Sequence, residues 1–188
     1  MTPAELLLGF VTLQRGVELA LAHRNTRRLL ERGAVEAGAR HYPAIVLFHA
    51  AWLAGLWLLG RNAELGLAWV AGFVLLQLLR IWVISSLGGR WTTRIILVPG
   101  APPSRRGPYR FLAHPNYLVV AGEIAILPLA LGLPAYALLS SIVNAGLLAV
   151  RITAENEALA RANHNAPPSP ALAGEGAPRV SEGRMRGV

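Results

Sequence analysis

The sequence predicts an all-α, polytopic integral membrane protein with about five transmembrane helices. Its 188 residues are 54% hydrophobic and 15% charged, which is too apolar for an ordinary soluble domain of this size. The apolar residues are also gathered in blocks, and polar connections separate these blocks. We expect one membrane domain over residues 1–163. Over residues 164–188, Pro, Gly, Ala and Ser dominate without periodicity, which is typical of a disordered tail.

The formal net charge of +8 comes from arginine alone, since the chain has no lysine. Binding to nucleic acid would require a soluble face lined by arginine, and the apolar blocks leave no room for one. We therefore expect no nucleic-acid partner. Cysteine is absent as well, which excludes a disulfide framework and a thiolate metal site, and we expect no metal.

The first block, Pro3–Ala22, lacks a basic leader and does not resemble a cleaved signal peptide. Arg15 and Glu18 lie inside it, three residues apart, so they share one face of a helix. We expect them to form a structural ion pair there, because pairing lets charged side chains tolerate a membrane site. This block would be the first helix.

The second block, Pro43–Gly60, is just long enough to cross the hydrocarbon layer. Its His49 is expected to be packed or hydrogen-bonded rather than a ligand. The third block, Leu65–Leu87, is amply long and carries Gln77 and Arg80 on one face. We favour the interpretation that Arg80 snorkels outward to the basic end of its helix. The alternative is that both side chains line a polar cavity.

The fourth and fifth blocks, Leu118–Leu133 and Ala135–Val150, flank Pro134 and predict a tight helical hairpin. Each helix would be about 24 Å long at a rise of about 1.5 Å per residue. Residues Arg151–Asn163 predict a cytoplasmic amphipathic helix that carries Glu155 and Glu157.

The connections His23–Tyr42 and Gly88–Tyr117 hold ten of the eighteen arginines. Five spans place both connections on the same side of the membrane as the C-terminus. The positive-inside rule makes that side cytoplasmic. We therefore expect a multi-pass protein of the bacterial inner (cytoplasmic) membrane, with its N-terminus outside.

The stretch Arg106–Tyr117 concentrates polar and aromatic groups directly before the fourth apolar block. Pro115 is expected at the first helical position, which places His114 at the N-cap, where free N–H groups and the helix dipole favour an anion. A Gly-Pro turn folds Tyr109 and Arg110 over the same spot. Anion-holding groups beside aromatic faces that attract a cation indicate a binder of a small charged molecule. An interfacial loop that grips lipid phosphates is an equal alternative.

The motifs Gly-Pro-Tyr-Arg at residues 107–110 and His-Pro-Asn-Tyr at residues 114–117 precede the hairpin and an acidic helix. This order resembles the signature of the isoprenylcysteine carboxyl methyltransferase family, most strongly over about residues 80–159. Residues 88–94 and 98–100 also resemble the bacterial branch that occurs with type III polyketide synthases and methylates alkylpyrones and alkylresorcinols. The sequence departs from the family pattern at Ala113, usually Arg, and at Asn156, usually a second Glu.

The resemblance implies a membrane methyltransferase that uses S-adenosylmethionine and methylates an oxygen of a lipophilic acceptor. That acceptor would resemble an alkylpyrone or alkylresorcinol, with a link to a type III polyketide synthase pathway, or an isoprenylcysteine carboxylate. The implied cofactor-binding residues are Tyr109, Arg110, His114, Pro115, Asn116, Tyr117 and Glu155. The implied catalytic residues are Arg151, which would touch the acceptor's oxygen, and Glu155 and Glu157, either of which would be the base or a cofactor ligand.

Three other interpretations stay open. Membrane reductases of the steroid-reductase type share a similar hairpin and His-Pro-x-Tyr element and would use NADPH. A phospholipid N-methyltransferase would keep the cofactor and change the acceptor. A lipid-binding or scaffolding membrane protein would need no catalytic residues at all.

Overall fold

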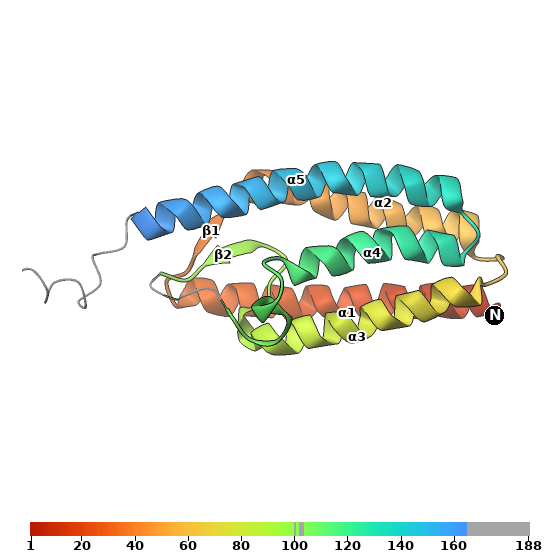
Figure 1. Ribbon diagram of the computed structural model, residues 1–188, viewed down its shortest axis with the longest axis horizontal. Coiled ribbons are helices and arrows are strands. Elements are labelled where there is room, and N and C mark those ends of the chain that lie inside the picture. Colours follow the sequence, from red (N-terminus) through yellow and green to blue (C-terminus); the bar gives the residue numbers. More distant parts are fainter. Residues whose placement is uncertain (100, 102–103, 165–188) are drawn as a thin grey trace, which may run out of the picture.

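The computed structural model describes residues 1–99, 101 and 104–164, which form an elongated bundle of α-helices (Figure 1). The all-α prediction is confirmed in the main, because the strands of this part of the chain are two three-residue segments. The prediction of a disordered tail lies, from residue 165 on, outside the described residues. With η for 3-10 helices, the elements are α1 Pro3–Glu31, β1 Val35–Ala37, η1 Ala39–His41, α2 Tyr42–Gly60, α3 Leu67–Leu87, η2 Gly88–Arg90, β2 Ile95–Leu97, η3 Gly107–Arg110, α4 Pro115–Ala130 and α5 Pro134–His164.

The sequence predicts about five spans, and three helices of the described chain are long and apolar enough to cross a membrane. They are Ala39–Gly60, Leu67–Arg90 and Pro134–Arg161, which correspond to α2, α3 and most of α5. Helix α4 is apolar but has 16 residues. Helix α1 has 29 residues but carries charged side chains along its length. The protein is therefore a membrane protein with three spans identified by length and composition.

Helix α1 is longer than its apolar block. It starts with a capping box in which Thr2 and Glu5 each satisfy the other's backbone N–H. The predicted helix ended at Ala22, but α1 continues to Glu31, because no helix breaker occurs before Gly33, where φ is +84°. The arginine-rich first half of the predicted connection is therefore helical.

The predicted hairpin is present, with two changes. Helix α4 begins at Pro115, with His114 as its N-cap residue, as expected. It ends at Ala130, and the chain then turns at Gly132, where φ is +68°. The segment Arg151–Asn163 is helical as predicted, but it continues α5 without a break, so that α5 is one helix of 31 residues.

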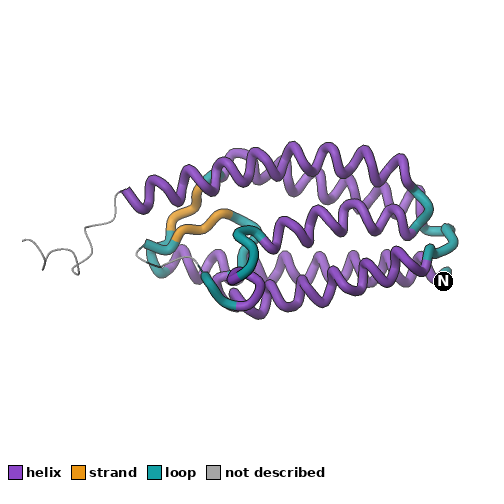
Figure 2. The backbone as a smooth tube through the Cα atoms, viewed as in Figure 1, coloured by secondary structure: helices purple, strands orange, loops and turns teal. Residues whose placement is uncertain are grey.

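The helices place both polar connections at one end of the bundle. Helix α4 packs on α3 and α5, and α2 packs on α1 and α5. At one end, β1 pairs with β2 in an antiparallel ladder with Val35 opposite Leu97. This ladder ties the two connections together beside the start of α4 (Figure 2). The order of the helices therefore brings η3, the first turn of α4 and the last turns of α5 to the same end of the bundle.

Two apolar clusters hold the bundle together. The larger joins α1, α2, α3 and α4, and the smaller lies at the end that carries the strands, where Val83, Trp91 and Val119 are buried. Large apolar side chains are exposed elsewhere, for example Leu58 at 81% and Leu47 at 71%. Exposed apolar surface of this extent is expected of a protein that faces lipid. His49 is hydrogen-bonded as predicted, since its Nδ1 lies 2.8 Å from the carbonyl oxygen of Ile45.

Candidate functional site

The first turn of α4 and the polar half of α5 meet in a group that we call the tyrosine cluster: His114, Tyr117, Arg151 and Glu155. Tyr117 is at its centre, because its hydroxyl donates to Glu155 Oε2 and accepts from Arg151 Nε at 2.9 Å. His114 Nδ1 lies 3.8 Å from the same Glu155 oxygen. A cationic and an anionic side chain thus flank one phenol.

Aromatic surface adjoins these charges. The rings of His114 and Tyr117 are stacked, with centroids 5.1 Å apart and planes inclined by 16°. The guanidinium carbon of Arg151 lies 5.5 Å from the centroid of the Tyr117 ring, within the range of a cation–π contact. The cluster therefore combines π faces, one carboxylate and one guanidinium within a single turn of each helix.

Local sequence explains this convergence. Pro115 is suited to the first helical position, which leaves His114 at the N-cap and puts Tyr117 in the first turn. On α5, Arg151 and Glu155 are four residues apart and share one helix face. The α4–α5 turn then aligns the two helices so that these faces meet.

The Gly-Pro-Tyr-Arg motif forms η3, which packs on α3. Gly107 has φ of +56°, and a Cβ there would collide with the Ser86 side chain of α3, so this turn requires glycine. Tyr109 then packs against the smaller apolar cluster. Burial, and next the negative charge of Glu155, raise the pKa of Tyr109 to about 12. The phenol of Tyr109 is therefore uncharged at neutral pH.

The tyrosine cluster is partly open and has unused hydrogen-bonding capacity. The side chains of His114 and Glu155 are 28% and 27% exposed. Arg151 is 8% exposed, yet its Nη atoms have no hydrogen-bond partner among the residues that the structure describes. The next residue in the motif, Asn116, has a buried Oδ1 that likewise lacks a partner in the described part of the chain. These groups are available to a ligand.

Two of the residues predicted from the sequence lie apart from this cluster. Glu157 is exposed and pairs with Arg161 at 3.2 Å, because two residues along a helix turn its side chain to another face. Arg110 is exposed, with its guanidinium carbon 5.2 Å from the centroid of the Phe111 ring. The structure thus brings together Tyr109, His114, Tyr117, Arg151 and Glu155, with Pro115 and Asn116 in the adjoining turn.

A second polar cluster, the buried network, lies between α1, α3 and α4. Arg80 at its centre is 2% exposed and donates at 2.9 Å both to Glu18, through Nη1, and to Glu123, through Nε. Arg15 contacts the same two carboxylates, at 2.9 Å for Glu18 and 2.7 Å for Glu123. Two arginines thus balance two glutamates. The full set is Gln14, Arg15, Glu18, Gln77, Arg80 and Glu123.

The buried network corrects one prediction and confirms another. The Arg15–Glu18 pair is present as expected. The interpretation that Arg80 snorkels is wrong, because Glu123 on α4 gives it an inward partner. Gln77 also donates to Glu123, at 2.7 Å. The sequence contained a signal for this contact, because Glu123 is the single carboxylate inside the apolar block Leu118–Leu133.

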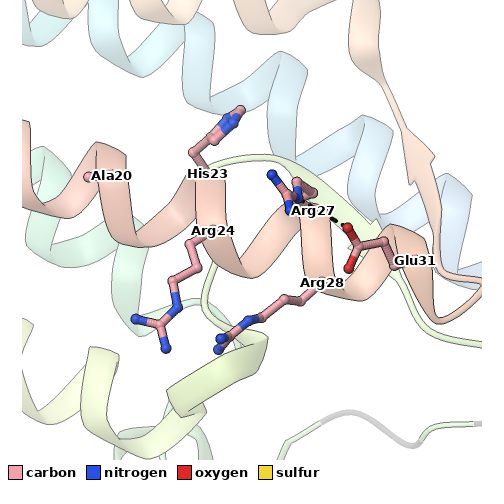
Figure 3. A pocket seen from close by; sticks show the side chains of 6 residues that line it. All are labelled: Ala20, His23, Arg24, Arg27, Arg28 and Glu31. Atoms are coloured by element: carbon pink, nitrogen blue, oxygen red, sulfur yellow. Dashed lines mark hydrogen bonds and ion pairs between the residues drawn. The ribbon is translucent and has the colours of Figure 1, made fainter.

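Two surface hollows lie along the last turns of α1, and neither includes a residue of the tyrosine cluster. The first has a volume of about 320 Å³ and is shown in Figure 3. The second has a volume of about 400 Å³ and reaches Tyr42, Thr93 and Arg94. Their lining is basic, and they mark a second region where charged side chains face outward.

Comparison with known proteins gives two matches. Residues 67–161 match the model of the isoprenylcysteine carboxyl methyltransferase (ICMT) family. The chain is also 38% identical over 159 residues to the uncharacterised protein YpbQ of Bacillus subtilis, a match that covers 82% of this chain and 95% of YpbQ. No solved structure matches the chain. The family match includes η3, α4 and the segment of α5 that carries the tyrosine cluster.

Proposed function

This chain belongs to the isoprenylcysteine carboxyl methyltransferase family, and we propose that it transfers a methyl group from S-adenosylmethionine to an oxygen of a lipophilic acceptor. Membership of the family and the apolar helices already point to a membrane methyltransferase. The donor, the acceptor atom and the roles of individual residues are our proposal. The observation that carries it is the convergence of Glu155, Arg151 and His114 on Tyr117.

The residues of the tyrosine cluster fit S-adenosylmethionine. Its sulfonium and ammonium groups are cationic and suit the stacked rings of His114 and Tyr117 and the carboxylate of Glu155. The unpartnered Oδ1 of Asn116 is a hydrogen-bond acceptor that an N–H group can satisfy. When bound, this cofactor supplies a methyl group on a positively charged sulfur and leaves as neutral S-adenosylhomocysteine.

Glu155 is the proposed base. Its carboxylate already accepts a hydrogen bond from the Tyr117 hydroxyl. In the proposed reaction it takes the proton that the acceptor's O–H group releases as the oxygen is methylated. Glu157 has no part in this proposal, because it faces Arg161 instead. Arg110 likewise has no part in it, because its guanidinium is exposed and lies over the Phe111 ring.

Arg151 holds the oxygen of the acceptor. Its Nε is fixed by Tyr117, and its Nη atoms have no hydrogen-bond partner in the described residues. A guanidinium there stabilises the negative charge that develops on an enolic, phenolic or carboxylic oxygen. Helices α4 and α5 then align the groups, so that positioning and exclusion of water supply much of the rate.

The acceptor is proposed to be lipophilic and to approach through the membrane. The tyrosine cluster lies at the end of a bundle whose outer surface is apolar, so an acceptor with a long alkyl chain can keep that chain in lipid. We propose that the acceptor is the hydroxyl group of a molecule like an alkylresorcinol or alkylpyrone, which an enzyme of the type III polyketide synthase class would make. We prefer this acceptor to an isoprenylcysteine carboxylate. The arginine-rich end would face the cytoplasm of a bacterium, where the cofactor is available.

The test is methyl transfer by the full chain in membranes. Membranes are incubated with S-adenosylmethionine labelled on its methyl group and, separately, with an alkylresorcinol, an alkylpyrone and an isoprenylated cysteine. Lipid extraction then locates the label. We expect label in a hydroxyl-bearing acceptor as an ether that survives treatment with base, whereas a methyl ester would be cleaved.

Each other outcome has a distinct meaning. Label in a base-labile product would identify a carboxylate acceptor and overturn the hydroxyl. Label in extracted phospholipid would identify an N-methyltransferase. Absence of transfer to all these acceptors, combined with tight binding of NADPH, would contradict the methyltransferase proposal in favour of a reductase.

A further inference from the structure

The exposed face of α1 changes from apolar to basic along its length. Leu13 and Val17 are 70% and 61% exposed, and Arg24 and Arg28 are exposed further along. The intervals of four, seven and four residues keep all four side chains on one face of the helix. Val17 and Arg24 are separated by about 10 Å along the axis at about 1.5 Å per residue.

The two arginines at the end of this face are free to bind an anion. Neither Arg24 nor Arg28 has a hydrogen bond or ion pair within the part of the chain that the structure describes. The nearby acid Glu31 is engaged by Arg27 at 3.0 Å. Both arginines line the 320 Å³ hollow, and Figure 3 shows them extending to the same side of α1 while His23 points the other way.

The position of this hollow matches the surface of a membrane. Asn25, between the two arginines, donates to the carbonyl oxygens of Gly88 at 3.2 Å and Trp91 at 2.8 Å. Those carbonyls lie where the apolar span of α3 ends. Arg24 and Arg28 are therefore level with the end of a span, where the phosphates of lipid headgroups lie.

We propose that this face of α1 binds one anionic phospholipid, with an acyl chain along Leu13 and Val17 and the headgroup phosphate between Arg24 and Arg28. The apolar part of the face suits an acyl chain, and two guanidinium groups that have no ion pair among the described residues suit a phosphate. The site is separate from the tyrosine cluster, so it stands or falls independently of the proposed methyl transfer.

Native mass spectrometry of the full chain in detergent tests this site. Phosphatidylglycerol and phosphatidylcholine of equal chain length are offered in equal amounts. We expect retention of phosphatidylglycerol over phosphatidylcholine. Each juxtamembrane arginine strengthens attraction to anionic lipid by about 1 kcal/mol, about fivefold, so Arg24→Gln/Arg28→Gln should weaken phosphatidylglycerol binding about 25-fold.

The matched control is Arg40→Gln/Arg61→Gln, which removes the same charge from two other exposed positions and should change binding less than about threefold. The unfolding temperature of each variant reports its folding. Equal retention of the two lipids by the wild-type chain would overturn the site without any variant. Equal loss in the two double variants, or displacement of the lipid by millimolar inorganic phosphate, would also overturn it.

Discussion

In the buried network, two arginines and two glutamates meet between α1, α3 and α4, and each charge faces an opposite one. In the tyrosine cluster, one arginine and one glutamate flank a phenol between α4 and α5. Arg80 at the centre of the first is 2% exposed, whereas the Glu155 side chain of the second is 27% exposed. The two regions use the same chemical groups at different depths.

The difference lies in which region is open to a ligand. A charged residue inside a membrane helix is by default a candidate for function, and by that criterion the buried network would be the first choice. Its two carboxylates are however paired with Arg15 and Arg80, and its two unpartnered atoms among the described residues, Gln14 Oε1 and Arg15 Nε, are buried, as expected of a structural connection between helices. In the tyrosine cluster, by contrast, the Nη atoms of Arg151 and the Oδ1 of the adjoining Asn116 lack a partner among the described residues and lie near the partly exposed side chains of His114 and Glu155. Unused capacity beside an opening, rather than burial of charge, identifies the site here.

The largest expected effect is the loss of stability in Glu123→Ala. This change leaves the buried Arg80 and the half-buried Arg15 with a single carboxylate, and breaking a buried ion pair by removing one partner costs about 3–5 kcal/mol. We expect most of the protein to be lost from the membrane fraction and the remainder to unfold at a much lower temperature in detergent.

The control for Glu123→Ala is the double variant Arg80→Leu/Glu123→Leu. It removes one charge of each sign and leaves the Arg15–Glu18 pair in place. We expect this variant to be more stable than Glu123→Ala. If Glu123→Ala unfolds within about 1 kcal/mol of the wild type, the network is not the structural connection described here.

The next effect is on catalysis without loss of fold. Glu155→Gln removes the proposed base and should lower methyl transfer about 100-fold or more, while its unfolding temperature stays near that of the wild type. Glu157→Gln, two residues on and paired with Arg161, is the matched control and should keep activity within about twofold. Equal effects of the two changes would mean that the two carboxylates are not distinguished as the structure indicates.

A smaller effect is expected from Tyr117→Phe, which keeps the ring that stacks on His114. It deletes the hydroxyl that joins Arg151 to Glu155. We expect methyl transfer to fall about tenfold, or about 1.4 kcal/mol, in single-turnover measurements. The control is Tyr136→Phe, which deletes a hydroxyl that donates to the backbone carbonyl of Trp52 in the apolar core; it should leave the rate unchanged.

The smallest expected effect is a dependence of stability on alkaline pH. The folded protein holds the pKa of Tyr109 at about 12, above the ordinary value near 10. Above pH 10 the unfolded chain loses this proton first, so the free energy of unfolding falls between about pH 10 and 12. We expect the unfolding temperature to fall less in Tyr109→Phe than in the wild type between these pH values. The two decreases should differ by roughly 2–4 °C. Parallel declines in both proteins would exclude Tyr109 as the cause.

Local pattern predicted the parts of the fold and site that depend on one segment. Proline at position 115 specified the start of α4, and the three-residue interval between Arg15 and Glu18 specified their pairing. A two-residue interval on a helix could likewise have separated Glu155 from Glu157. The sequence alone was enough for these features because each follows from helix geometry.

Contacts between distant segments were beyond that reasoning. Arg80 and Glu123 are 43 residues apart, and only the packing of α3 against α4 brings them together. The short ladder between β1 and β2 has the same origin, since each strand has three residues and no pattern long enough to recognise. Partners supplied by another helix decided whether Arg80 turned outward or inward.

The central claim is that the tyrosine cluster binds a sulfonium cofactor. The most direct test is equilibrium binding of S-adenosylhomocysteine to the detergent-purified chain, by calorimetry, with NADPH as the competing ligand and Arg151→Gln/Glu155→Gln as the variant. We expect saturable binding of S-adenosylhomocysteine that the double variant weakens at least about tenfold and that NADPH does not displace. Binding of NADPH in its place, or equal binding of S-adenosylhomocysteine by variant and wild type, would contradict the claim.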